Sequence, residues 1–240
     1  MHRFHVPAEE ITGNQIQLDR AESHHASSVL RIRPGEIVEV LDGEGGRYRC
    51  RTHSVERRSV SLLVEDVRKE AEPSFRIGLF QSVLKGKAMD LLIQKVTETG
   101  VTDIHPILSR HCVAKPSDAE KWRQITIEAA KQCGRSWLPR IHSISSLSDE
   151  VGSALYPLHL VGALQEGCRS IIEALPEQRP EGVAIWIGPE GDYSTAEMDA
   201  LLEGGALPVT LGPHVQRAET AAISSTSILV NLLFSSSASA

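Results

Sequence analysis

The chain has 240 residues and a formal net charge of −6, and 41% of its residues are hydrophobic. This length and composition exclude a disordered chain and allow one large domain or two small ones with a real core. No apolar stretch is as long as a membrane span or resembles the core of a signal peptide, so we expect a cytoplasmic protein with no membrane partner. The four cysteines are widely spaced, which indicates free thiols and no zinc site.

Charge is distributed unevenly along the chain. Residues 1–140 carry 22 Lys and Arg against 19 Asp and Glu, whereas residues 141–240 carry 3 against 12. A polyanion such as a nucleic acid would therefore meet the first 140 residues. A solvated surface of mixed charge explains the same asymmetry, so charge alone identifies no partner.

Residues 1–70 predict a small β-rich domain. Three short β-prone runs follow one another, and Pro34-Gly35 and Asp42-Gly43 are turn signals beside them. A short helix is expected near residues 22–30. These features fit a small β-barrel, and the polar segment 69–73 has the composition of a linker.

Beyond the linker, strand and helix patterns alternate. The expected elements are a strand at 75–79, a helix from Met89 that Gly100 ends, a strand at 101–108, a helix that Ser117 and Glu120 cap and that runs to Cys133, strands at 157–163 and 183–188, a helix that Ser194 and Glu197 cap, a strand at 209–212 and a helix at 218–234. Strands separated by helices predict an α/β domain with a mostly parallel sheet over residues 74–236.

Two Gly-Pro segments are the best candidates for ligand loops. Gly188-Pro189-Glu190-Gly191 lies between a buried strand and a capped helix, and Leu211-Gly212-Pro213 repeats this design. Ligands in open α/β sheets bind at the carboxyl ends of strands, where glycine allows a close approach to the backbone. Each segment alone is equally compatible with a tight turn that binds nothing. Neither a G-x-G-x-x-G motif nor a Walker loop is present.

The segments IGPEGDYSTAE and LGPHVQRAETA, in this order, resemble the two signature loops of the RsmE family. These are ribosomal-RNA uridine-N3 methyltransferases of the SPOUT superfamily. The resemblance extends to His24-His25 with Val29-Leu30-Arg31, to LKGKAMDLLIQKVTETGV and to IEAAKQCGR, and it covers residues 1–233.

The resemblance implies a PUA-like RNA-binding β-barrel over residues 1–70 and a SPOUT methyltransferase domain over residues 74–236. It also implies a C-terminal trefoil knot, which is very rare among folds and rests on the resemblance alone. The implied cofactor is S-adenosylmethionine (SAM). The implied partners are a second copy of the chain, in a homodimer, and small-subunit (16S) ribosomal RNA or the assembled small subunit.

The needs of the implied reaction and the positions of basic residues suggest roles for individual residues. The predicted cofactor-binding residues are Gly162, Leu164, Ile187, Gly188, Glu190, Gly191, Leu211, Gly212 and Val215. Arg217 is predicted to stabilise negative charge on uracil, and Glu219 to accept the N3 proton, with helix capping as the alternative role of Glu219. The predicted RNA-binding residues are Arg3, His24, His25, Arg31, Lys85 and Arg135. The reaction requires no metal. The apolar residues expected at a dimer interface or in the core are Ile228, Leu229, Leu232 and Leu233.

Four positions depart from the family pattern. Asp192 stands where the family usually has glycine, His214 where it has arginine, Gln216 where it has a bulky aliphatic residue, and Lys131 where it has an acidic residue. Arg217 is therefore the one permanent cation between Glu181 and the C-terminus. These departures keep two alternatives open: a non-catalytic RNA- or ribosome-binding protein with the same fold, and a methyltransferase for another RNA.

Overall fold

The computed structural model describes residues 1–113, 119–164 and 167–234. They form two compact units, one of residues 1–72 with 127–138 and one of the described residues within 73–126 and 139–234. The predicted boundary at residues 70–74 puts residues 127–138 in the second domain, whereas they pack with the first unit. None of the described helices has the length and apolar character that crossing a bilayer requires.

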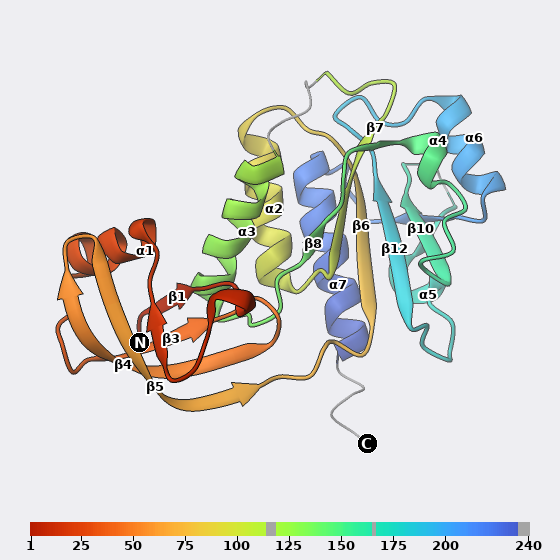
Figure 1. Ribbon diagram of the computed structural model, residues 1–240. Helices are drawn as coiled ribbons and strands as arrows, with labels where there is room; N and C mark the ends of the chain where they lie inside the picture. Colours follow the sequence, from red (N-terminus) through yellow and green to blue (C-terminus); the bar gives the residue numbers. More distant parts are fainter. Residues whose placement is uncertain (114–118, 165–166, 235–240) are drawn as a thin grey trace. The chain divides into compact units, whose positions relative to one another are not determined.

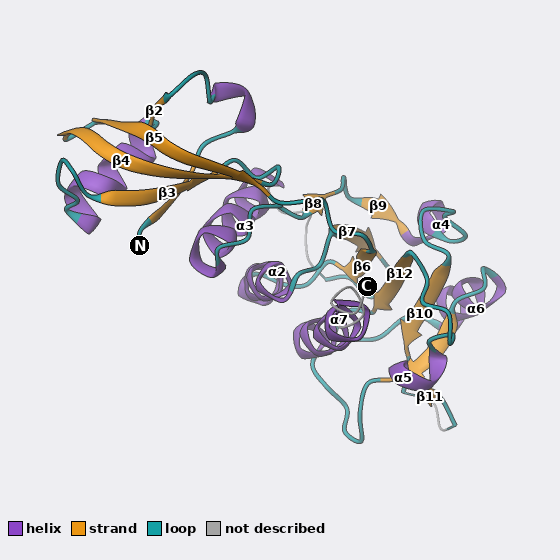
Figure 2. Cartoon of the chain, turned by 90° about the horizontal axis from the view of Figure 1, so that it is seen from below, coloured by secondary structure: helices purple, strands orange, loops and turns teal. Residues whose placement is uncertain are grey.

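The first unit is built on a five-stranded sheet in the order β1-β3-β4-β5-β2 (Figures 1 and 2). Its strands are β1 Arg3–His5, β2 Gln15–Gln17, β3 Ile37–Leu41, β4 Gly46–Glu56 and β5 Ser59–Lys69. The pair β1 and β3 is parallel, and the other pairs are antiparallel. Side chains of alternate strand residues, such as Phe4, Val38 and Leu62, fill the core of this unit.

The predicted helix near residues 22–30 is present in two parts. Helix α1, Arg20–His24, continues as a π-helical turn over His25–Leu30 and ends at Arg31, whose φ of 55° is left-handed. Asp19 caps the helix, because its Oδ1 accepts a hydrogen bond of 2.7 Å from the Glu22 amide.

The second unit contains an eight-stranded sheet in the order β11-β13-β10-β12-β6-β7-β8, with β9 paired to β7. Its strands are β6 Arg76–Ser82, β7 Asp103–Leu108, β8 Arg140–Ile141, β9 Ser145–Ser146, β10 Leu158–Gly162, β11 Arg169–Ser170, β12 Gly182–Ile187 and β13 Leu207–Thr210. All of these pairs are parallel, which confirms the predicted α/β domain.

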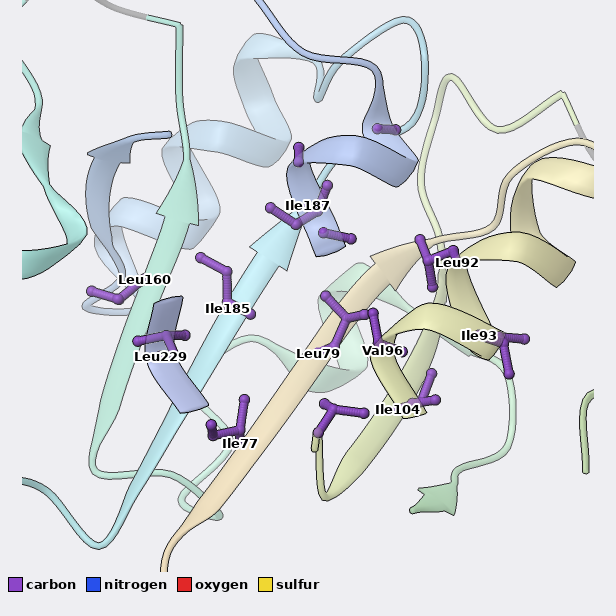
Figure 3. Packing of buried hydrophobic residues seen from close by; sticks show 14 of the residues in the cluster. Ile77, Leu79, Leu92, Ile93, Val96, Ile104, Leu160, Ile185, Ile187 and Leu229 are labelled. Carbon is purple, nitrogen blue, oxygen red and sulfur yellow. The ribbon is translucent and has the colours of Figure 1, made fainter. Parts of the chain in front are cut away.

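Helices cover both faces of this sheet. The helices after β6 are α2 Lys87–Thr99, α3 Ala119–Cys133, α4 Leu147–Glu150, α5 Ile171–Ala174, α6 Thr195–Glu203 and α7 Ala218–Phe234. Residues 127–133 of α3 belong to the first unit. Ile77 and Leu79 pack in one core cluster with α2 and α7 (Figure 3). Phe80, the next residue of β6, belongs to a separate cluster with residues of α4 and α6. This alternation is the two-residue period of a strand that is buried on both faces.

Most of the predicted element ends are found in the structure. Gly100 ends α2 with a left-handed φ of 108°, and Ser194 and Glu197 form a capping box before α6. The last strand is shifted from the predicted 209–212, because β13 ends at Thr210 and Leu211-Gly212 already belong to the following loop. Ser117, the predicted cap of α3, lies outside the described residues.

Candidate active site

A cavity of about 730 Å³ lies where β10, β12 and β13 end. Three loops and the start of α7 wall it. The lining residues are Ala88, Gly162, Ala163, Leu164, Ile187, Gly188, Pro189, Glu190, Asp192, Thr210, Leu211, Gly212, Pro213, His214, Val215, Gln216, Arg217, Ala218, Glu219 and Ala221. Eight of the nine predicted cofactor residues and both predicted catalytic residues are in this set. Parallel strands bring their carboxyl ends to one edge, which explains why loops distant in sequence meet here.

Gly191 is the predicted cofactor residue that does not line the cavity. The first loop makes a tight turn, in which the Asp192 amide donates to the Pro189 carbonyl at 2.9 Å. This turn directs Gly191 away from the cavity and towards His111, because a Cβ added at Gly191 would lie 3.3 Å from the His111 Cβ. Close packing of this turn against His111 therefore explains why residue 191 has no side chain.

Asp192 has a left-handed φ of 59°, a conformation that glycine adopts at little cost, which suits the glycine expected at this position. Aspartate tolerates this conformation better than most residues. Its Oδ1 accepts a 2.7 Å hydrogen bond from the Tyr193 amide, which supports the turn. The substitution therefore keeps the loop's backbone conformation and adds a carboxylate to the cavity wall.

Gln81, at the end of β6, is a site feature that the sequence reasoning missed. Its side chain is fully buried, and Nε2 donates to the Ser82 carbonyl at 2.9 Å and approaches the Ile187 and Gly188 carbonyls at 3.4 Å. Gln81 thus joins two neighbouring strand ends below the first loop. The signal was available, since it is a polar residue at the carboxyl end of an apolar strand.

Gln216 supports the second loop through a bridge that a bulky aliphatic residue cannot make. Its Nε2 donates to the Leu211 carbonyl at 3.0 Å, and its Oε1 accepts from the Ser224 hydroxyl of α7 at 2.8 Å. Gly212 lies beneath this bridge with a φ of 141°, in the range that favours glycine. The departure at Gln216 therefore supplies its own stabilising contacts.

Arg217 and Glu219 lie at the start of α7, where the first helical hydrogen bond runs from the Ala221 amide to the Arg217 carbonyl at 2.8 Å. Arg217 is exposed and Glu219 is half-buried. Both line the cavity together with the carboxylates of Glu190 and Asp192. The position of Glu219 in the first turn also suits the helix dipole, so its capping role remains an alternative.

The predicted RNA residues differ in their surroundings. Arg3 is engaged within its own unit: Nε donates to Glu39 at 2.9 Å, and Nη1 donates to the Lys131 and Gln132 carbonyls at 3.2 and 3.0 Å. This geometry favours a structural role for Arg3 over a phosphate contact. The exposed members of the set are His24, Arg31 and Lys85, and the half-buried ones are His25 and Arg135.

A second polar cluster lies in the sheet away from the cavity. Asp103, His105 and His142 bring possible metal-ligating atoms within 4.8 Å of one another. The two imidazole rings are stacked, with centroids 3.8 Å apart and planes within 10°. Ring lone pairs lie in the ring planes, so two parallel rings cannot both point at one ion. The His142 Nε2 is instead paired with Asp103 at 2.9 Å, and His105 Nε2 meets the Tyr156 hydroxyl at 3.0 Å.

Burial, together with the neighbouring His142, lowers the pKa of His105 to about 4. The unfolded chain therefore binds a proton at this residue that the folded protein excludes between about pH 6.5 and 4. The stability from a neutral His105 is fully present above pH 6.5 and is lost as the pH falls.

We expect protonation of His105 to lower the unfolding free energy by about 3 kcal/mol between pH 7 and 4. In urea unfolding, His105→Gln should lose less unfolding free energy between pH 7 and pH 4 than the wild-type protein does. Equal losses in the two proteins would contradict the prediction.

Comparison with known proteins identifies the family. The family model of the RNA methyltransferase domain matches residues 70–230, and that of the RNA methyltransferase PUA domain matches residues 18–65. The chain belongs to the RNA methyltransferase family. A ribosomal RNA small subunit methyltransferase E of Aquifex aeolicus is 33% identical, over 96% of this chain and 100% of the relative.

Solved structures support the same assignment for this methyltransferase. A Neisseria gonorrhoeae ribosomal RNA small subunit methyltransferase E, bound to SAM, is 26% identical with a TM-score of 0.87, covering 97% of this chain and 98% of its own. A Legionella pneumophila protein in complex with SAM is 32% identical with a TM-score of 0.86, covering 96% and 97%. The predicted α/β methyltransferase domain and the predicted PUA domain are confirmed, while the SPOUT classification and the trefoil knot stay predictions.

The four apolar residues near the end of α7 divide into two groups. Leu229 and Leu233 are buried in the core, whereas Ile228 is 37% exposed and Leu232 is half-buried. The first pair therefore stabilises the fold of the second unit. Only the second pair is available for the predicted homodimer, which stays a prediction.

Proposed function

We propose that this protein transfers a methyl group from SAM to N3 of a specific uridine in small-subunit ribosomal RNA. The observation that carries the proposal is the cavity that gathers the two Gly-Pro loops, Arg217 and Glu219 in a member of the RNA methyltransferase family. The similarity to ribosomal RNA small subunit methyltransferase E supports the substrate class. Such an enzyme works in the cytoplasm on ribosomal RNA or on the assembled subunit.

The chemistry of the cavity fits SAM. Its volume of about 730 Å³ lies within the usual range of ligand pockets, which is about 300–1,000 Å³. Ile187, Leu211 and Val215 offer apolar surface to an adenine ring, and the loop backbones offer hydrogen bonds to its edge. The carboxylates of Glu190, Asp192 and Glu219 favour a cationic group.

The reaction requires N3 of uridine to lose its proton as the new N3–methyl bond forms. SAM would supply the methyl group from its positively charged sulfur, and the S–CH3 bond would break as the N3–methyl bond forms, leaving a neutral thioether. Arg217, exposed at the cavity rim, stabilises negative charge on the uracil oxygens. Glu219, in the first turn of α7, accepts the proton. The loops hold the reacting groups in line, which is a positioning effect.

Residues of both units contribute affinity for RNA in this proposal. His24, Arg31 and Lys85 are exposed, and their contacts with phosphates would weaken as salt rises. Arg135 and His25 are more buried and are better suited to shape recognition. None of these residues lines the cavity, so their substitution should lower RNA affinity without changing cofactor affinity.

Nucleoside mass spectrometry of ribosomal RNA tests the whole proposal. RNA from cells that lack the gene should miss one N3-methyluridine of the small subunit, and the wild-type gene should restore it. An unchanged nucleoside profile would contradict the proposed function. Loss of a methylated nucleoside from another RNA would favour the alternative substrate.

Filling the cavity tests the cofactor site. Ala221 of α7 is 8% exposed and lines the cavity, so Ala221→Phe adds a ring to this wall. The ring occupies volume that the cofactor needs, so we expect SAM affinity measured by calorimetry to fall by about tenfold or more, which corresponds to about 1.4 kcal/mol of binding free energy. The matched control is Ala196→Phe on an exposed position of α6. Wild-type affinity in a folded Ala221→Phe variant would contradict this site.

The same titration separates an enzyme from a non-catalytic RNA-binding protein, because the latter should not bind SAM. Asp192 was one reason to consider this alternative. Its left-handed backbone and its hydrogen bond to the Tyr193 amide support a loop conformation that accommodates aspartate. Light scattering at micromolar concentration tests the proposed homodimer.

A further inference from the structure

His111 approaches the first cavity loop from a segment that follows β7. Its Nδ1 lies 3.1 Å from the Gly191 carbonyl and 2.9 Å from the Asp192 carbonyl. Both partners are hydrogen-bond acceptors, so Nδ1 must carry a proton in this arrangement. One imidazole N–H therefore binds the two consecutive carbonyls at the end of the first loop. The earlier residues of this loop, Gly188–Glu190, line the cavity.

This loop has a reason to need such support. Asp192 adopts a left-handed φ of 59°, a conformation that costs free energy in residues other than glycine. The two carbonyls that His111 binds lie on either side of the Asp192 α-carbon. A donor that binds both of them stabilises this conformation against a relaxed one.

Arg110, the residue before His111, binds Glu197, which lies a few residues after the first loop. The Arg110 amide donates to Glu197 Oε1 at 2.7 Å, while Glu197 Oε2 accepts from the Ser194 amide and hydroxyl at 2.9 and 2.7 Å. Despite its partial burial, these hydrogen bonds and the nearby His111 lower the pKa of Glu197. Residues 110 and 111 thus hold the segment from Gly191 to Glu197 at both ends.

We propose that His111 is a positioning residue for the cofactor: its Nδ1–H fixes the Gly188–Asp192 loop in the shape that binds SAM. His111 does not line the cavity, so it acts through the loop. The inference rests on the proposed cofactor site and adds a residue that neither Gly-Pro motif contains.

Three substitutions separate the donor from the bulk of the ring. Asparagine carries an N–H donor as many bonds from the α-carbon as Nδ1 of histidine, whereas glutamine carries its donor one bond further out. His111→Leu keeps apolar bulk and has no donor. Net loss of a hydrogen bond of this kind typically corresponds to about tenfold in affinity. We therefore expect about tenfold weaker SAM binding for His111→Leu and His111→Gln, and near wild-type binding for His111→Asn.

Calorimetric titration with SAM, far below the melting temperature of every variant, is the measurement. The matched control is His53→Leu, at an exposed position of β4. Methylation kinetics should show a raised KM for SAM with a smaller change in kcat. A variant that melts earlier but binds SAM as tightly as wild type would reduce His111 to a stability role and overturn the proposal.

The wild-type titration keeps the two proposals apart. If the wild-type protein does not bind SAM, the proposed function fails. If wild type and His111→Leu bind SAM equally, the function stands and the role of His111 is wrong. If asparagine does not restore affinity, a donor at the Nδ1 position is not what the loop requires, and the proposal is also overturned.

Discussion

Replacing Arg217 by alanine is expected to lower the single-turnover rate of RNA methylation by about 100- to 1000-fold, the usual effect of removing one preorganised donor to a developing anion. Arg217 lines the cavity at the start of α7 and is the one permanent cation from Glu181 to the C-terminus. A group that acts mainly in the transition state contributes little to cofactor binding. SAM affinity should therefore stay within a few-fold of wild type.

Saturating SAM and RNA in the assay ensure that binding does not limit the rate. Arg217→Lys should recover only part of the activity, since an ammonium group cannot make a planar two-pronged contact. Arg179→Ala is a control for loss of positive charge elsewhere in the same unit. If Arg217→Ala methylates RNA at the wild-type rate, Arg217 is a surface residue and the proposed stabilisation of uracil is wrong.

Replacing Lys131 by methionine is expected to lower the unfolding free energy by about 3–5 kcal/mol, because removal of one partner leaves a buried charge uncompensated. Lys131 lies in the first unit, with Nζ 2.7 Å from Glu22 Oε1 and 2.8 Å from Glu128 Oε1. The side chains of Lys131 and Glu22 are only 9% and 10% exposed. Burial raises the pKa of Glu22, and Lys131 opposes that rise.

Urea unfolding at pH 8 and pH 5 measures this effect. Without Lys131 the pKa of Glu22 should rise further, so protonation below that pKa should make the deficit smaller at pH 5 than at pH 8. The double variant Glu22→Gln with Lys131→Met should recover most of the lost stability. Glu128 is largely exposed, and Glu128→Gln is the control with a small expected effect. A Lys131→Met variant as stable as wild type at pH 8 would contradict the buried ion pair.

The family departure at Lys131 acquires a physical reason from this contact. The lysine stands where the resemblance predicts an acid, and Glu22, more than one hundred positions earlier in the chain, pairs with it. Nothing in the local sequence of either residue predicts the pairing. The same contact is part of the packing that places residues 127–138 with the first unit.

Local sequence patterns were sufficient to predict most of the helices and strands of the second unit. The two-residue alternation of Ile77 and Leu79, the glycine after α2 and the capping box before α6 are short-range features, and each is present as expected. The Gly-Pro segments also identified the cavity, because the rule that ligands meet strand carboxyl ends depends only on the order of elements. Motif spacing therefore determined the α/β class, the parallel sheet and the cavity-lining loops.

Contacts between distant segments decided the rest. Gly191 belongs to the same motif as Gly188, yet the turn at Pro189 directs it to His111 instead of the cavity. Arg3 has the charge of a phosphate ligand, yet the carbonyls at the end of α3 occupy it. Gln81 on β6 and His111 in the segment after β7 support the cavity loops, and neither residue belongs to a Gly-Pro motif. A sequence pattern reports the periodicity of one element, whereas the partner of a polar side chain depends on which elements fold against each other.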